Sequence, residues 1–465
     1  MGFHALSPPP GGFTLRVKYS EPRPQMRVTA DGKDLVSHAG TRLLADMAER
    51  CGLQDDLSVA LSPLVRRRRK HDVGRVLVDL AVMAADGGGY CSDLAPMRDQ
   101  PGLFGPVASQ PTAWRLLDKI DDDLRARMNI GRAKARKRVW AAGLAPKTYT
   151  LDFDATLINV HTEKQNASPT YKKGFGYHPL LAFLDETNEA LAGMLRPGRA
   201  GSNTAADHVA LLDEALSQLP VKCKGDDADH GVAMLVRADS AGATHGFVNA
   251  IVAKHMDFSI GFDVTVAVQV AILQVPGGNW VEPMRQNMEA REGAQVAEIT
   301  EWLDLSAWPA GTRAICRREE PHPGAAFTLF EPQGWRHQVF ITNSVDADII
   351  YLEVRHRRHA HVEDRIKGVK AVGLDHFPSN DYATNCAWLQ TVLIGCDLSV
   401  WTQALCLEGT MAVAEPKKLR WALWHTAGKI TTSGRRRTLH LDGAWPWAAA
   451  LEKGFQRLER LHFTT

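Results

Sequence analysis

Three acidic residues have the type and placement that a metal-dependent reaction on phosphate esters requires. Asp154 lies in an alternating, β-branched segment, Asp239 ends another apolar segment, and Glu363 lies in a segment of helical character. Hard divalent ions prefer carboxylate oxygens, and two such ions about 4 Å apart activate an attacking oxygen and stabilise a leaving one. Three clustered carboxylates repel one another unless cations neutralise them. We therefore predict that these acids are catalytic and bind two Mg²⁺ ions, with Mn²⁺ as a substitute.

Each of these acids, taken alone, also fits a structural role. An Asp at the end of a strand commonly caps a turn, and Glu363, next to Asp364, is placed like an ordinary surface acid of a helix. Asp152 has the same strand parity as Asp154, so either residue could be the first metal ligand. The prediction rests on the positions of the three acids taken together rather than on any single acid.

The elements around the acids follow a recognisable order. Three consecutive strands are followed by a helix, a strand, a helix and a strand, at residues 148–158, 178–186, 190–198, 205–219, 232–240, 243–256 and 257–265. This order is typical of an RNase H-like α/β fold, a mixed sheet flanked by helices with right-handed crossovers. In such a sheet the first and fourth strands are neighbours, so the carboxylates of Asp154 and Asp239 would converge. A helix packed across the sheet could present Glu363 to the same point.

Changes in pattern along the chain predict six segments. They are a poorly ordered start (1–40), a helical DNA-binding domain (41–146), a first part of the catalytic core (147–273), a β-rich insertion (274–344), a last part of the core with the Glu363 helix (345–410) and a C-terminal tail (411–465). Within the insertion, strands are expected at 312–320, 326–332 and 337–343. Within the tail, a hairpin is expected over 419–441, with Gly434 near its turn.

Basic residues form four runs although the chain is nearly neutral overall. Lys and Arg number 55 against 53 Asp and Glu, so the net charge of +2 does not indicate a nucleic-acid-binding protein. The runs cover residues 66–70, 132–138, 355–358 and 435–437. A single basic run is as often a solvated face as a phosphate-binding surface. Four separate runs favour contacts with phosphates at several places.

Cysteine usage and hydropathy indicate the compartment. The seven cysteines include no C-x-x-C pair and their number is odd, so we expect neither a disulfide framework nor a structural zinc site, and a reducing cytosol fits best. The histidines and cysteines also lack the usual zinc-ligand spacing. No signal peptide and no membrane span is expected, which predicts a soluble protein.

Several segments resemble the insertion-sequence-1380 family of bacterial DDE transposases, over most of the chain from residue 41 on. They are LDFDATLI, GYHPLLAFLDE, LRPGRAGSN, VRADSAG and HRRHAHVEDRIKGVKAVGLDHFPSNDYATNCAWL. The Ala-Thr after Asp154 matches the residues that follow the first acid in related enzymes, which leaves Asp152 as a supporting or structural acid. The family's final helix carries Tyr, Arg, Glu and Lys, and Lys370 stands at the expected place, seven residues after Glu363. The expected Tyr and Arg positions hold His356 and His359 instead.

The resemblance implies an enzyme that recognises terminal inverted repeats, cuts the element ends and joins them to target DNA. It also implies a homodimer on paired ends of double-stranded DNA, in the bacterial cytoplasm at the nucleoid. The side chains implied to contact DNA are Lys370, Arg358, Arg357, His359 and Lys367. Trp302 and Trp308 are candidates to hold a flipped base, with burial in the core as the competing interpretation. Runs 66–70 and 132–138 would contact the DNA backbone.

Two other functions stay open at this point. A nuclease or resolvase with the same fold would cut DNA without joining it. A catalytically inactive relative would bind DNA only, although the presence of all three acids and Lys370 argues against that reading.

Overall fold

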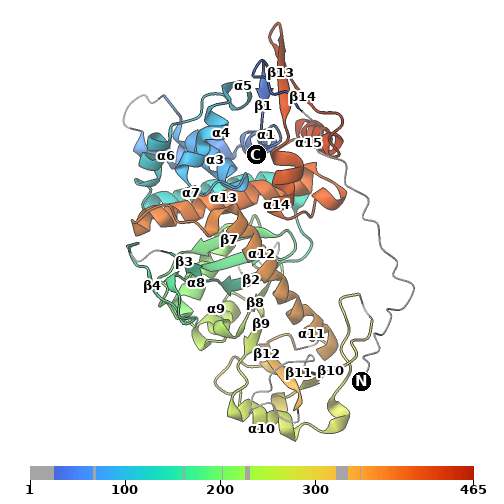
Figure 1. Ribbon diagram of the computed structural model, residues 1–465. Coiled ribbons are helices and arrows are strands. Elements are labelled where there is room, and N and C mark those ends of the chain that lie inside the picture. Colours follow the sequence, from blue (N-terminus) through green and yellow to red (C-terminus); the bar gives the residue numbers. More distant parts are fainter. Residues whose placement is uncertain are drawn as a thin grey trace, which may run out of the picture.

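The structure is a computed structural model that describes residues 26–65, 70–160, 163–201, 203–225, 231–287, 289–320, 334–345 and 347–464. The expectations for residues 1–25, for Arg66–Arg69 and for the strand at 326–332 lie outside the described residues. A helical layer lies at one end of the molecule, a large sheet in the middle and the insertion strands at the opposite end (Figure 1).

Five strands form the centre of the sheet in the predicted order. They are β7 (Glu189–Met194), β6 (Leu180–Leu184), β2 (Thr150–Ala155), β8 (Leu235–Ala238) and β9 (Asp257–Phe262), in that spatial order. The first three are antiparallel, whereas β2, β8 and β9 run parallel to one another. The predicted fold class, a mixed sheet flanked by helices in the RNase H-like order, is confirmed.

The insertion continues this sheet rather than forming one of its own. Its strands β12 (Arg336–Thr342), β11 (Arg313–Glu319) and β10 (Ala294–Glu298) follow one another outward from β9, all antiparallel. The helix α10 (Val266–Gln274), which the sequence pattern did not predict, connects β9 to the insertion. The short strands β3 (Ile158–Asn159), β5 (Phe175–Tyr177) and β4 (Ser168–Pro169) make a small separate sheet.

Helices cover both faces of the large sheet. The described helices are α1 (Thr41–Arg50), α2 (Leu53–Ala60), α3 (Val73–Ala85), α4 (Ala95–Arg98), α5 (Pro101–Phe104), α6 (Gln110–Leu117), α7 (Asp122–Val139), α8 (Ala205–Ser217), α9 (His245–Ala253), α11 (Ile349–Arg357), α12 (His361–Val369), α13 (Tyr382–Cys406), α14 (Pro416–Leu419) and α15 (Ala448–Arg460). Leu181 and Phe183 of β6 share a core with α12 and α13, whereas Leu180 and Ala182 share a core with α8 and α9. The two faces of the strand thus serve two cores, as the two-residue period requires.

One buried core joins the N-terminal and C-terminal helices. The long helix α13 packs against α3 and α1 and against α15 near the end of the chain. Trp388, Trp401 and Trp424 are among the largest fully buried side chains of this part of the molecule. The N-terminal helices therefore depend on α13 for their apolar contacts.

The basic run at 132–138 is partly buried, which corrects the expectation that it faces DNA. Arg132 and Arg136 lie inside α7 with both side chains at most 1% exposed, and both bind Oδ2 of the buried Asp397 of α13, at 2.9 and 2.8 Å. Arg136 also donates to Glu189 of β7 at 2.8 Å. Glu189 further accepts from the indole of Trp401 at 2.8 Å. These arginines link α7, β7 and α13 instead of contacting solvent.

The predicted C-terminal hairpin is present but shorter than expected. Its strands are β13 (Gly428–Ser433) and β14 (Arg436–Leu441), with Gly434 at φ 59° in the turn, and they project from the molecule (Figure 1). Residues 420–424, which were expected in the hairpin, form a helical turn instead. Within the segment expected to lack order, β1 (Leu35–Val36) pairs with β13. Arg435–Arg437 are exposed at the tip.

Six cysteines are free thiols: Cys51, Cys91, Cys316, Cys386, Cys396 and Cys406. In the described parts of the chain, no helix combines the length and the apolar character needed to cross a membrane.

Candidate active site

The ends of two adjacent parallel strands bring Asp154 and Asp239 together. Phe153 of β2 is in register with Ala238 of β8, and the two aspartates are the next residue in each strand direction. Phe153 and Ala238 face the core beneath α8 and α9. Because side chains alternate along a strand, both aspartates face the opposite side, where α12 lies.

A close backbone approach fixes the turn that holds Asp239. Its Oδ1 accepts from the backbone N–H of Ala241 at 3.1 Å, so the side chain caps the turn after β8. A Cβ on Gly261 of β9 would lie 2.7 Å from the backbone N of Ser240. A side chain at position 261 would therefore displace the turn that presents this carboxylate.

Glu363 approaches the same point from the first turn of α12, which packs against β2. Burial, together with the negative charges of Asp239 and Glu363, raises the pKa of Asp154 to about 6, although His359 opposes the shift. Asp154 therefore lies within electrostatic range of both other acids, although the three are far apart in the sequence.

The three carboxylates do not form a compact three-ligand cluster in the described residues. In the parts of the chain that the structure describes, three ligand atoms of His, Cys, Asp or Glu come within 4.8 Å of one another only at His38, Asp86 and His425. The oxygens of Asp154, Asp239 and Glu363 are therefore spaced more widely. Carboxylate oxygens are nevertheless the donors that hard cations such as Mg²⁺ prefer.

Both carboxylate oxygens of Asp152 are bound by basic side chains. Both of its oxygens accept from Arg237 of β8 at 2.7 Å, Arg365 of α12 donates to Oδ2 at 2.7 Å, and Nδ1 of His359 lies 3.0 Å from Oδ1. Burial alone would raise the pKa of Asp152, but these hydrogen bonds hold it well below its usual range. The side chain is buried, so it anchors the basic side chains around it.

Sequence reasoning missed the ion-pair network around Asp152. Arg237 and Arg365 both also pair with Asp185, which follows β6. Arg365 thereby ties the helix that carries Glu363 to two strands of the sheet. The only signal in the sequence was a charged residue inside the apolar strand 232–240; Arg237 is in register with Asp152, which gives its charge a partner.

His356, at the position where relatives carry Tyr, is packed inside the protein. Its ring stacks on Phe340 of β12, with ring centroids 4.3 Å apart, and Nδ1 lies 3.0 Å from Oγ of Ser259. Burial and neighbouring positive charges lower the pKa of His356 to about 3. The imidazole is therefore neutral at physiological pH.

The five side chains expected to contact DNA have different surroundings. Arg358 and Lys367 are exposed, and Lys367 pairs with Asp364 on the surface at 2.8 Å. Lys370 is half-buried, with Nζ 3.4 Å from the carbonyl oxygen of Leu157. Arg357 and His359 instead contact protein groups: Arg357 donates to the carbonyl of Met284 at 2.5 Å, and His359 contacts Asp152 as described above.

Trp302 and Trp308 of the insertion are half-buried. Trp302 and Trp308 both pack against the core on the α8 and α9 side of the sheet. The ring of Trp308 lies 4.3 Å from that of His245 and 5.6 Å from that of Phe262. These contacts favour the core interpretation for Trp308.

The raised pKa of Asp154 predicts that Mg²⁺ binding depends on pH. Since protons and cations compete for a carboxylate, lowering the pH from about 7 to about 5 should weaken Mg²⁺ binding by roughly 10-fold. Calorimetric titration at several pH values measures this effect. Asp79→Asn removes another acid whose burial raises its pKa to about 6. This variant should leave the dependence of Mg²⁺ affinity on pH unchanged. Mg²⁺ affinity that does not change over this range would contradict the proposed environment of Asp154.

A mixed central sheet of this strand order, flanked by helices, defines the class of RNase H-like folds. The family model described as "Transposase DDE domain group 1" matches residues 19–463. The chain therefore belongs to this family of DDE transposases.

One similar solved structure is the cryo-EM structure of the piggyBac transposase synaptic complex with hairpin DNA. It has a TM-score of 0.41 and 10% sequence identity, over 82% of this chain and 80% of that chain. No curated protein sequence matches this chain.

Proposed function

We propose that the protein is an insertion-sequence transposase of the insertion-sequence-1380 type, with Asp154, Asp239 and Glu363 as its catalytic metal ligands. It cuts the element ends at terminal inverted repeats and joins them to target DNA. The observation that carries the proposal is the register of β2 and β8, which sets Asp154 beside Asp239, with the Glu363 helix α12 packed against β2, in a chain of the DDE transposase family.

The protein's own groups hold the site in shape. Asp154 and Asp239 stand on paired strands, whose backbone ladder fixes their spacing. Glu363 stands on a helix that Arg365 anchors to the sheet. Two Mg²⁺ ions, when bound, would activate the attacking oxygen and stabilise charge on the leaving oxygen. Preorganised ligands are effective because they do not have to rearrange during the reaction.

DNA would lie along α11 and α12, with Arg358, Lys367 and Lys370 as phosphate contacts. Arg357 and His359 would act by positioning these helices, since each already binds a protein group. We further propose a homodimer on paired ends, acting at the bacterial nucleoid.

Arg358→Ala should weaken DNA binding to a similar extent for all sequences. The side chain is exposed, and loss of one phosphate contact should reduce the slope of log affinity against log salt by about 1. Fluorescence anisotropy over a salt series measures the slope. Lys453→Ala, on α15 at the other end of the molecule (Figure 1), removes an exposed cation as a control. An unchanged slope for the Arg358 variant would remove this residue from the interface.

A strand-transfer assay tests the function itself. Purified protein, Mg²⁺, a pre-cleaved duplex carrying one inverted repeat and a supercoiled target plasmid should give joined products. Cleavage without joining would identify a nuclease or resolvase instead. DNA binding with neither reaction would identify an inactive relative.

A further inference from the structure

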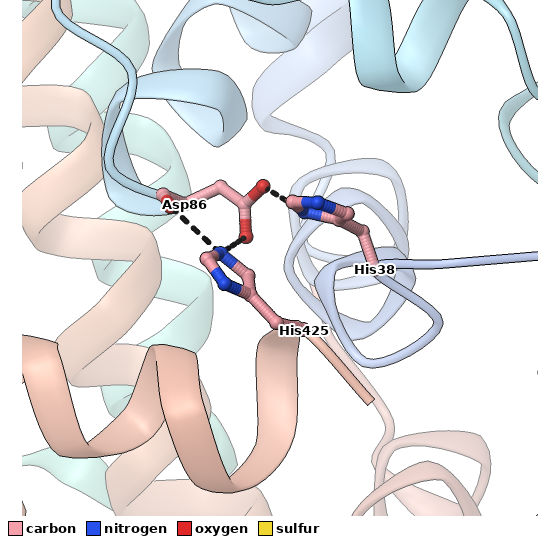
Figure 2. A group of neighbouring side chains, drawn as sticks. All are labelled: His38, Asp86 and His425. Carbon is pink, nitrogen blue, oxygen red and sulfur yellow. Dashed lines mark hydrogen bonds and ion pairs between the residues drawn. The ribbon is translucent and has the colours of Figure 1, made fainter. Parts of the chain in front are cut away.

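Two histidines and an aspartate converge at the base of the small sheet formed by β1, β13 and β14 (Figure 2). Nδ1 of His38 lies 2.6 Å from Oδ2 of Asp86, and Nε2 of His425 lies 3.2 Å from Oδ1 of the same carboxylate. The two imidazole rings have centroids 4.3 Å apart. One ligand atom from each side chain lies within 4.8 Å of the other two.

Three distant parts of the chain meet at this cluster. His38 follows β1, Asp86 ends α3, and His425 lies between a helical turn and β13. In the described chain, His38 is one of a few residues other than glycine in the left-handed region, at φ 56°. A residue is kept in such a conformation where its surroundings require it.

The central carboxylate is built as a ligand rather than as a surface acid. Its side chain is only 9% exposed, and Oγ1 of Thr41 donates to Oδ1 at 2.6 Å, which orients the group. Both of its oxygens therefore face the two imidazole rings in a fixed orientation.

The donor set selects a type of cation. Two imidazole nitrogens and one carboxylate oxygen suit Zn²⁺ and related transition metals, whereas Mg²⁺ prefers oxygen donors only. Three protein ligands leave a fourth position of a tetrahedral site for water. The outer hydrogen bond from Thr41 corresponds to the partners that usually orient metal ligands.

We propose that His38, Asp86 and His425 bind one divalent transition-metal ion of the Zn²⁺ type, separate from the catalytic acids. The ion joins residues near both ends of the chain, and it fixes the base of the projecting hairpin against α3. Sequence patterns could not predict this site, because ligands 48 and 339 residues apart have none of the short spacings that mark zinc sites.

The test is calorimetric titration of the chelator-treated full chain. In the triple variant Asp154→Ala/Asp239→Ala/Glu363→Ala, we expect one equivalent of Zn²⁺ to bind and Mg²⁺ to give no signal. His38→Asn and His425→Ala should each weaken Zn²⁺ binding by at least about 100-fold, more than the loss of an outer-shell partner. Asn tolerates positive φ, so the His38 variant keeps its backbone. Circular dichroism checks that each variant is folded.

His255→Asn is the matched control, since His255 is exposed and also left-handed, at φ 55°. It should leave Zn²⁺ binding unchanged. A triple-acid variant that binds no Zn²⁺, or a His38→Asn/His425→Ala variant that binds it as tightly as its parent, would overturn the proposal. The cluster would then be an ion-paired hydrogen-bond network. Strand transfer with Mg²⁺ is measured separately, so failure here is distinguishable from failure of the proposed function.

Discussion

Asp239→Asn is expected to reduce strand transfer by at least about 100-fold while DNA binding is retained. Replacing an outer-shell partner of a metal costs about 10- to 100-fold in activity, and a direct ligand should cost more. Asn keeps the shape of the side chain and can still accept from Ala241, because Asp and Asn are similar caps. The loss would therefore report the missing charge rather than a misfolded turn. Joined products in the strand-transfer assay measure it.

Asp304→Asn provides a close control for this variant. Asp304 is exposed, and its Oδ1 accepts from the backbone N–H of Ser306 at 3.0 Å, the same two-residue arrangement as Asp239 and Ala241. The strand-transfer activity of the Asp304→Asn variant should equal that of the parent protein. Asp154→Ala and Glu363→Ala should behave like Asp239→Asn. Normal strand transfer by the Asp239 variant would show that the three acids do not form the catalytic site.

Asp397→Ala is expected to destabilise the fold by about 3–5 kcal/mol, because removing one partner of a buried ion pair leaves an uncompensated charge. Asp397 is fully buried, and Arg132 and Arg136 both bind it. Glu189 remains beside Arg136, so Arg132 suffers the larger loss. The midpoint of urea denaturation measures the effect.

Asp123→Ala is the control for Asp397→Ala, because it removes an exposed acid of α7 instead of the buried partner of that helix. Asp123 pairs with Arg127 at the surface of α7, with 70% of its side chain exposed, and surface pairs contribute about 0–1 kcal/mol. We expect little change in the denaturation midpoint. If the Asp397 and Asp123 variants lost equal stability, the buried arginines would have found other partners.

Local patterns predicted the order of the central strands, because alternation and β-branched residues report strands directly. They could not predict which strands pair when the sequence between them is long. The pairing of β12 with β9, residues 339–342 with 262–259, depends on contacts across the whole insertion. Periodicity alone cannot supply such a register.

Charge was the least reliable guide to position. Arg132 and Arg136 belong to a run that reads as a solvated face, yet both are buried. Arg237 stands in an apolar strand, and its partners Asp152 and Asp185 come from two other places in the chain. The burial of a charged residue depends on a partner far away in sequence, which composition does not reveal. The proximity of Asp154 and Asp239 was easier to predict, because strand order alone places them on adjacent strands.

The antiparallel seam between β9 and β12 also has a consequence for shortened forms of the protein. Without residues 274–344, the backbone N–H and C=O groups of β9 would face water along an apolar margin. An unpaired strand edge of this kind is a template on which other chains can assemble. Any shortened form of this protein would therefore need another strand, or charged side chains along the edge of β9, to prevent aggregation.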